Sequence, residues 1–275
     1  MGLREAMAAI AAKSRGELTY SDVVDAYIYY FRLDFDPVGI KFCTDEAEIS
    51  QYKVNTKAKT KLTYCQRLAM ARGGHKAMFM PARELLCENA APVFGFRELD
   101  PEKDTKSHMK YLRDEKLAWE APLGKAKLPL GSCYGIYTAP LAMFDASGVD
   151  PDIVFFMLLP YQAYHVLNDY MGATGRSNLT FNHTTCSAVC SGSVWAFNHN
   201  TANMTTTCAG SKTSGKSDMS MVNLFIPGTQ IKDSAAQLLK RVTDMGGPSV
   251  LGKGGEPWPG MDVCKGCPMF KYETV

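Results

Sequence analysis

Cysteine is the residue type with the clearest chemical potential in this sequence. The chain has nine cysteines, namely Cys43, Cys65, Cys87, Cys133, Cys186, Cys190, Cys208, Cys264 and Cys267. Thiolates bind soft or borderline metals, and four of them close a tetrahedral zinc site or hold an iron–sulfur cluster. Nine is an odd number, and 275 residues exceed the size of a small disulfide-stapled scaffold. Because no export signal is evident, we expect a cytoplasmic protein whose cysteines are free, buried or metal-bound.

Spacing favours seven of these cysteines as metal ligands. Cys186 and Cys190 are four residues apart, so a helix would place both thiols on one face. Cys264 and Cys267 form a Cys-x-x-Cys pair followed by Pro268, a spacing found in zinc and iron–sulfur motifs. We expect an iron–sulfur cluster, with zinc as the alternative. The candidate ligands are Cys65, Cys87, Cys186, Cys190, Cys208, Cys264 and Cys267.

The remaining thiols and the histidines have plainer interpretations. Cys43 and Cys133 are expected to pack as small buried hydrophobes. His183 and His199 flank the Cys186 region, so either could complete a mixed Cys/His site. A lone histidine within a helix, such as His165, is more often structural.

Residues 210–217 spell the phosphate-loop pattern G-x-x-x-x-G-K-S. That loop works only when a buried strand precedes it and a helix, whose N-terminus faces the phosphate, follows it. Here residues 204–208 make a poor strand, and residues 218–226 resemble a strand instead of a helix. We therefore expect no nucleotide site, but a loop that could hold an anionic ligand through Lys212, Lys216 and Ser217.

Helix and strand patterns that do not alternate as clean β–α–β units predict the framework that positions these residues. Capping signals and apolar periodicity predict helices before residue 34 and again near residues 63–71, 160–171, 186–198 and 234–245. Strands are predicted at residues 38–43, 134–144, 152–159, 178–185 and 219–226. A further helix is expected to open at Pro81, and residues 97–120 should form a charged helical insert. This mixture predicts an α+β fold with a mixed sheet and packed helices.

Composition limits the class of protein. The chain is 46% hydrophobic and 21% charged, with a net charge of +2, so it should form a packed core. This balance gives no case for a nucleic-acid or membrane-surface partner. We expect one domain at residues 1–245. An irregular tail at residues 246–275, rich in glycine and proline, should carry the Cys-x-x-Cys pair.

Several motifs together resemble an uncharacterised archaeal and bacterial family, domain of unknown function 169. The resemblance spans about residues 20–245. It is carried by DPVGIKF (36–42), YCQRLAMARGG (64–74), ARELLCENAAPVFGF (82–96), DPDIVFFMLLPYQAYHVLNDYMGATG (150–175) and NLFIPG (223–228). The resemblance implies family cysteines at Cys65, Cys87, Cys190 and Cys208. It implies no established reaction, so it does not decide whether the chain is an enzyme.

These observations predict an accessory or electron-handling protein of an anaerobic redox system, with a redox partner protein and a homo-oligomeric state. A metal-free module for an anionic ligand is the alternative. A structural subunit that docks through its tail is the third possibility.

Overall fold

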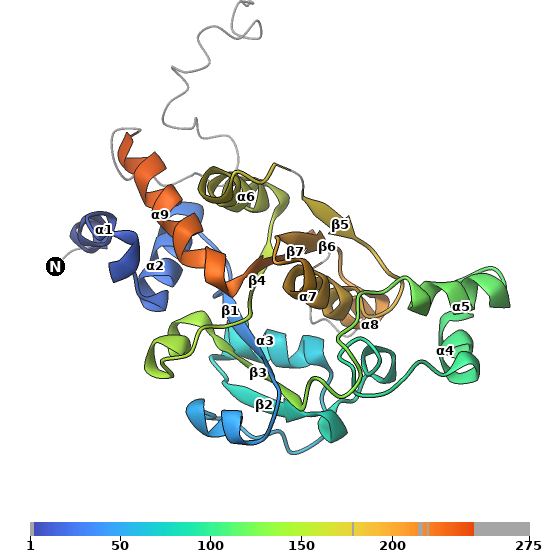
Figure 1. Cartoon of the computed structure of the whole chain (residues 1–275). Helices are drawn as coiled ribbons and strands as arrows, with labels where there is room; N and C mark the ends of the chain where they lie inside the picture. The colour runs from blue at the N-terminus through green and yellow to red at the C-terminus, as the bar shows by residue number, and fades with distance from the viewer. Residues whose placement is uncertain (1–2, 178, 214–216, 219, 245–275) are drawn as a thin grey trace, which may run out of the picture.

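The computed structural model describes residues 3–177, 179–213, 217–218 and 220–244. Its centre is a seven-stranded sheet with the strand order β2-β3-β1-β4-β7-β6-β5 (Figure 1). The strands are β1 (Val38–Cys43), β2 (Met78–Pro81), β3 (Gly135–Pro140), β4 (Ile153–Leu158), β5 (Thr180–Asn182), β6 (Asn203–Thr205) and β7 (Val222–Pro227). The pair β5–β6 is parallel and the other strand pairs are antiparallel, so the predicted α+β class with a mixed sheet is confirmed.

Helices cover both faces of the sheet. The helices are α1 (Leu3–Ala11), α2 (Tyr20–Phe31), α3 (Tyr64–Gly74), α4 (Pro101–His108), α5 (Glu115–Leu123), α6 (Pro160–Thr174), α7 (Ala188–His199), α8 (Ala209–Thr213) and α9 (Gly228–Asp244). Helices α2, α6 and α9 lie on one side of the strands, and α3 and α7 lie on the other (Figure 1). None of the described helices combines the length and the apolar character that crossing a bilayer requires.

Strand β4 shows why the sheet needs two covering layers. Successive side chains of a strand point to opposite faces. Val154 and Phe156 belong to the apolar core beneath α2 and α9, whereas Phe155 and Met157 belong to the core beneath α3 and α7. Every residue of β4 is therefore buried, which explains its uninterrupted apolar sequence.

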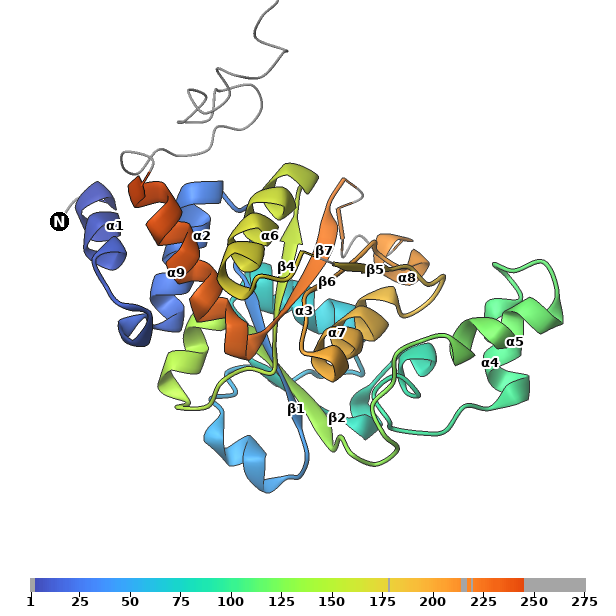
Figure 2. The ribbon, with the colours of Figure 1, turned by 45° about the horizontal axis from the view of Figure 1, so that its top comes forward.

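The predicted charged insert is confirmed as the helical pair α4 and α5. The two helices contact each other and project from the side of the sheet domain (Figure 2). The loop that follows α5 then returns to the sheet and enters β3.

Two local predictions are wrong. Pro81 does not open a helix, because it ends strand β2, and a single 3-10 turn (Ala82–Glu84) follows. Strand β2 lies at the edge of the sheet, where proline costs no ladder hydrogen bond. The predicted strand over residues 134–144 ends at Pro140, and a 3-10 helix (Leu141–Ala146) takes its place. The predicted tail, residues 246–275, lies outside the described residues.

Candidate functional site

A cavity of about 260 Å³ contains four of the seven candidate cysteines. Its wall includes Cys65, Cys87, Cys190 and Cys208, which come from four separate segments of the chain. The same four thiols are those implied by the family resemblance. The other lining residues are Thr63, Tyr64, Gln66, Leu86, Ser187, Gly210 and Ser211.

Helix α3 places Cys65 in its first turn. Thr63 is the N-cap of α3, and its hydroxyl accepts a hydrogen bond from the Gln66 N–H at 3.2 Å. In return the Gln66 carboxamide accepts the Thr63 N–H at 2.8 Å. This reciprocal capping box satisfies two free N–H groups and fixes the start of the helix. The position of Cys65 is therefore set by local sequence.

Helix α7 places Cys190 in the same cavity, but its start differs from the prediction. The helix begins at Ala188, after Ser187 in a left-handed conformation with φ of 61°. Cys186 thus lies outside the helix, and the expected shared helical face with Cys190 is wrong. Cys186 is buried but does not line the cavity.

Ser187 leaves a polar atom inside this site. Its hydroxyl is buried, lines the cavity and has no hydrogen-bond partner among the described residues. The start of α7 also has no side-chain cap. A buried hydroxyl without a partner costs roughly 1–3 kcal/mol. The Ser187 hydroxyl is therefore available to a polar group bound in the cavity.

Backbone N–H groups point at two of the thiols. Cys87 precedes the 3-10 turn Glu88–Ala90, and its sulfur accepts from the backbone of Asn89 and Ala90. Burial raises the pKa of Cys87, while these N–H groups act in the opposite direction. The sulfur of Cys208, which precedes α8, accepts from the backbone of Ser211 and Ser187. Donors of this kind stabilise a thiolate.

The thiols also contact one another. Cys65 hydrogen-bonds to Cys190 and to Cys208, and the contact with Cys190 is the largest cause of its raised pKa. Burial disfavours ionisation of a thiol, and a neighbouring thiolate disfavours it further. All seven cysteines among the described residues are free, so no disulfide links them there.

A buried lysine that was not among the predicted site residues lies behind this wall. Lys125 follows α5, and burial lowers the pKa of its ammonium, while the thiols of Cys186, Cys190 and Cys87 act in the opposite direction. Burial raises the pKa of Cys186, and Lys125 is the main group that opposes this shift. No sequence signal distinguished Lys125 from the other lysines of the chain.

The arrangement of the thiols bears on the kind of metal group they could hold. Within the described part of the chain, no three His, Cys, Asp or Glu side chains are placed to hold a single metal ion. Zinc requires its sulfur ligands at about 2.3 Å from one point. The thiols line a wall instead of meeting at a point.

The other predicted residues lie elsewhere. His183 is exposed and bonds to Thr206, and His199 is exposed and stacks on Trp195, so neither lines the cavity. Cys264 and Cys267 lie outside the described residues, as does Lys216. Cys43 and Cys133 are buried in the core, as predicted.

The phosphate-loop string does not have the surroundings that such a loop needs. Helix α8 occupies residues within the string, and strand β7 comes after it. Lys212 is exposed, and the Ser217 hydroxyl lies 3.0 Å from that of Ser211. Because Ser211 lines the cysteine cavity, the loop borders the same site.

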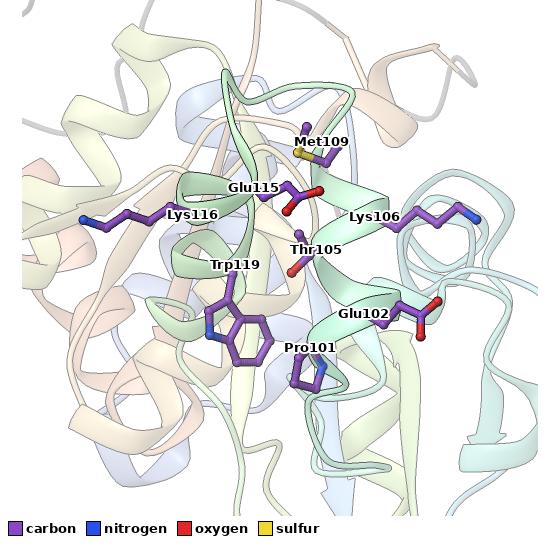
Figure 3. A pocket seen from close by; sticks show the side chains of 8 residues that line it. All are labelled: Pro101, Glu102, Thr105, Lys106, Met109, Glu115, Lys116 and Trp119. Atoms are coloured by element: carbon purple, nitrogen blue, oxygen red, sulfur yellow. The ribbon is translucent and has the colours of Figure 1, made fainter.

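A second hollow, of about 650 Å³, lies between α4 and α5 (Figure 3). Its lining mixes two carboxylates and two lysines with Met109 and Trp119. The lysine side chains point outward, and neither cysteine nor histidine is among the lining residues (Figure 3). The hollow is a surface groove of the helical insert, and the cysteine cavity is the stronger candidate.

Comparisons with known proteins agree with the sequence motifs. The family described as DUF169, uncharacterised ArCR, matches residues 28–237. No curated protein and no solved structure matches the chain. The family match covers well over half of the sequence and includes Cys65, Cys87, Cys190 and Cys208. The chain therefore belongs to the DUF169 family.

Proposed function

We propose that this chain binds an iron–sulfur cluster in the cysteine cavity and acts as an electron-handling protein. The observation that carries the proposal is the presence of Cys65, Cys87, Cys190 and Cys208 on one cavity wall. Four cysteine thiolates are the usual ligand set of two-iron and four-iron clusters. A bound cluster supplies one-electron transfer, and the chain supplies its ligands, hydrogen bonds and shielding from water.

The size of the cavity favours a cluster over a single ion. A water molecule needs only about 10–15 Å³ of such space, whereas this cavity offers about 260 Å³. A lone zinc ion would leave most of that volume empty. Ligands of a cluster stand farther apart, because they bind different metal atoms on its outside.

Hydrogen bonding to the thiols supports the same proposal. The N–H groups directed at Cys87 and Cys208 would stabilise negative charge on these sulfurs. Such bonds are among the features that set the reduction potential of a cluster. Ligation requires the Cys65 side chain to rotate away from Cys190 and Cys208, which it now contacts.

Three candidate ligands remain besides the four of the cavity wall. Cys186 is buried but does not line the cavity, so it is not among the four proposed ligands. Cys264 and Cys267 lie outside the described residues and stay candidate ligands. We place the protein in the cytoplasm, where a reducing environment keeps thiols free. A redox partner protein and a homo-oligomeric state complete the proposal.

A small anionic ligand without metal is the second candidate for the same cavity. The observation that favours it is the buried Ser187 hydroxyl, which has no partner among the described residues. Such a hydroxyl could donate to a carboxylate or phosphate oxygen. Inorganic phosphate, tested by calorimetry on metal-free protein, distinguishes this candidate from the first.

Anaerobic purification tests the proposal directly. We expect a brown protein with iron and acid-labile sulfide in equal amounts, and with broad visible absorption. The Cys190→Ser and Cys65→Ser variants should lose most of both. Cys43→Ala is the matched control, because Cys43 is buried elsewhere in the core, and it should keep the wild-type iron content.

Two results would contradict the cluster. A colourless protein with one zinc per chain would favour the zinc alternative. Iron and zinc both at trace level, in protein that folds normally, would remove the metal centre altogether.

A further inference from the structure

Lys125 is a buried cation held in a fixed position beside the cysteine wall. The residue is 6% exposed. The next residue, Ala126, donates its N–H to the Ser191 hydroxyl of α7 at 3.0 Å. This bond ties the loop to the helix that carries Cys190. Lys125 therefore keeps a defined place relative to that thiol.

His108 is the hydrogen-bond partner of Lys125. The Lys125 ammonium lies 3.0 Å from Nε2 of His108, and Nδ1 of the same ring lies 2.7 Å from the Asp104 carbonyl oxygen. A carbonyl oxygen only accepts, so Nδ1 carries the proton and Nε2 accepts from the ammonium. Burial lowers the pKa of His108, which agrees with a neutral ring. The pair therefore carries its positive charge on Lys125.

No carboxylate forms an ion pair with Lys125 within the described residues. No Asp or Glu oxygen there lies within 4.0 Å of the Lys125 ammonium. The nearby Asp104 is held by Arg97 through two bonds of 2.8 Å. Burial lowers the pKa of Lys125, and the neighbouring groups that act in the opposite direction are the thiols of Cys186, Cys190 and Cys87, followed by Asp104.

A buried charge without a counter-ion is costly, so an anion bound near this lysine would lower that cost. We propose that Lys125, positioned by His108, is the counter-charge for an anionic centre bound in the cysteine cavity. This inference rests on the proposed function, because a thiolate-ligated cluster supplies that negative charge. Lys125 acts here through its charge alone and ligates nothing.

The electrostatic consequence has a definite sign. Reduction adds one electron and so one negative charge to the centre, and a nearby cation stabilises the more negative state. Removing the Lys125 charge should therefore make reduction harder. We expect the equilibrium constant for reduction by dithionite, the electron donor in the assay, to fall about tenfold, or about 59 mV for one electron.

The experiment compares three full-length variants with the wild type under anaerobic conditions. Lys125→Met removes the charge and keeps most of the side-chain volume, whereas Lys125→Arg keeps the charge. Lys127→Met is the matched control, because Lys127 lies on the same loop and its ammonium binds the Leu123 and Lys125 carbonyls. The midpoint potential should fall in Lys125→Met alone.

Melting temperature gives a second readout that needs no redox activity. In metal-free protein, Lys125→Met removes an uncompensated buried charge and should raise the melting temperature. In cluster-loaded protein the same change should lower it. We expect this reversal of sign in Lys125→Met and no such reversal in Lys127→Met.

The outcomes separate the inference from the proposed function. Wild-type iron loading with an unchanged potential in Lys125→Met would overturn the inference and leave the proposed function standing. Wild type without iron would overturn the proposed function. In that case a lower melting temperature for metal-free Lys125→Met would overturn the inference as well, whereas a rise would support an uncompensated charge at Lys125.

Discussion

His165 should make the fold sensitive to mild acid. This histidine lies in α6 and stacks on the Phe31 ring, with centroids 5.6 Å apart and planes inclined by 19°. Burial, with a smaller contribution from the charge of Arg241, lowers the pKa of His165 to about 4. The native fold therefore holds this imidazole in its neutral form.

The sign of the effect follows from this lowered pKa. In the unfolded chain His165 takes up a proton near pH 6.5, whereas the folded chain resists protonation down to about pH 4. The stability that neutral His165 contributes is fully present above pH 6.5, and it is lost as the pH falls from 6.5 to about 4. One pKa unit corresponds to about 1.4 kcal/mol, so the free energy of unfolding that is lost through His165 is at most about 3 kcal/mol. Solvent screening at the partly exposed ring reduces this to about 2 kcal/mol.

Urea unfolding at pH 7.5 and at pH 4.5 measures this loss. The His165→Phe variant keeps the stacking surface but cannot be protonated. Between the two pH values we expect the wild type to lose about 2 kcal/mol more than this variant. His199→Phe is the control, since His199 is exposed, and it should behave like the wild type. Equal acid losses in His165→Phe and the wild type would refute the argument.

Two further substitutions test the packing around the site. Gly192→Ala should destabilise the protein by about 1–3 kcal/mol and reduce its metal content. The new Cβ would lie 2.4 Å from the Thr205 side chain and push α7 away from the sheet. An unchanged urea midpoint would contradict this. Arg241→Leu should cost about 3–5 kcal/mol, since it leaves the fully buried Asp169 without the guanidinium that bonds it at 2.7 and 2.8 Å. A loss below about 1 kcal/mol, as at an exposed ion pair, would show that this pair does not hold α6 to α9.

Elements with strong local signals could be predicted from the sequence. The Thr19–Asp22 capping box begins α2, and Pro160 begins α6, as expected. The apolar run that forms β4 was also predicted. In each case the preference for helix or strand depends on residues close together in the chain.

Elements whose stability depends on a partner were missed or misplaced. Strand β2 and the three-residue strand β6 exist because neighbouring strands accept their hydrogen bonds. The residues within such short segments do not predict that pairing. The exact start of α7 was missed for a similar reason, since Ser187 adopts its left-handed conformation without a local glycine.

The sequence by itself determined the α+β class, the family and the cysteines worth considering. Only the tertiary structure decided which of them share a cavity, because thiols separated by more than a hundred residues meet through sheet order and helix packing. It also excluded Cys186 from the cavity wall and placed Lys125 behind that wall. Burial and electrostatic fields belong to the assembled fold, and no short stretch of sequence encodes them.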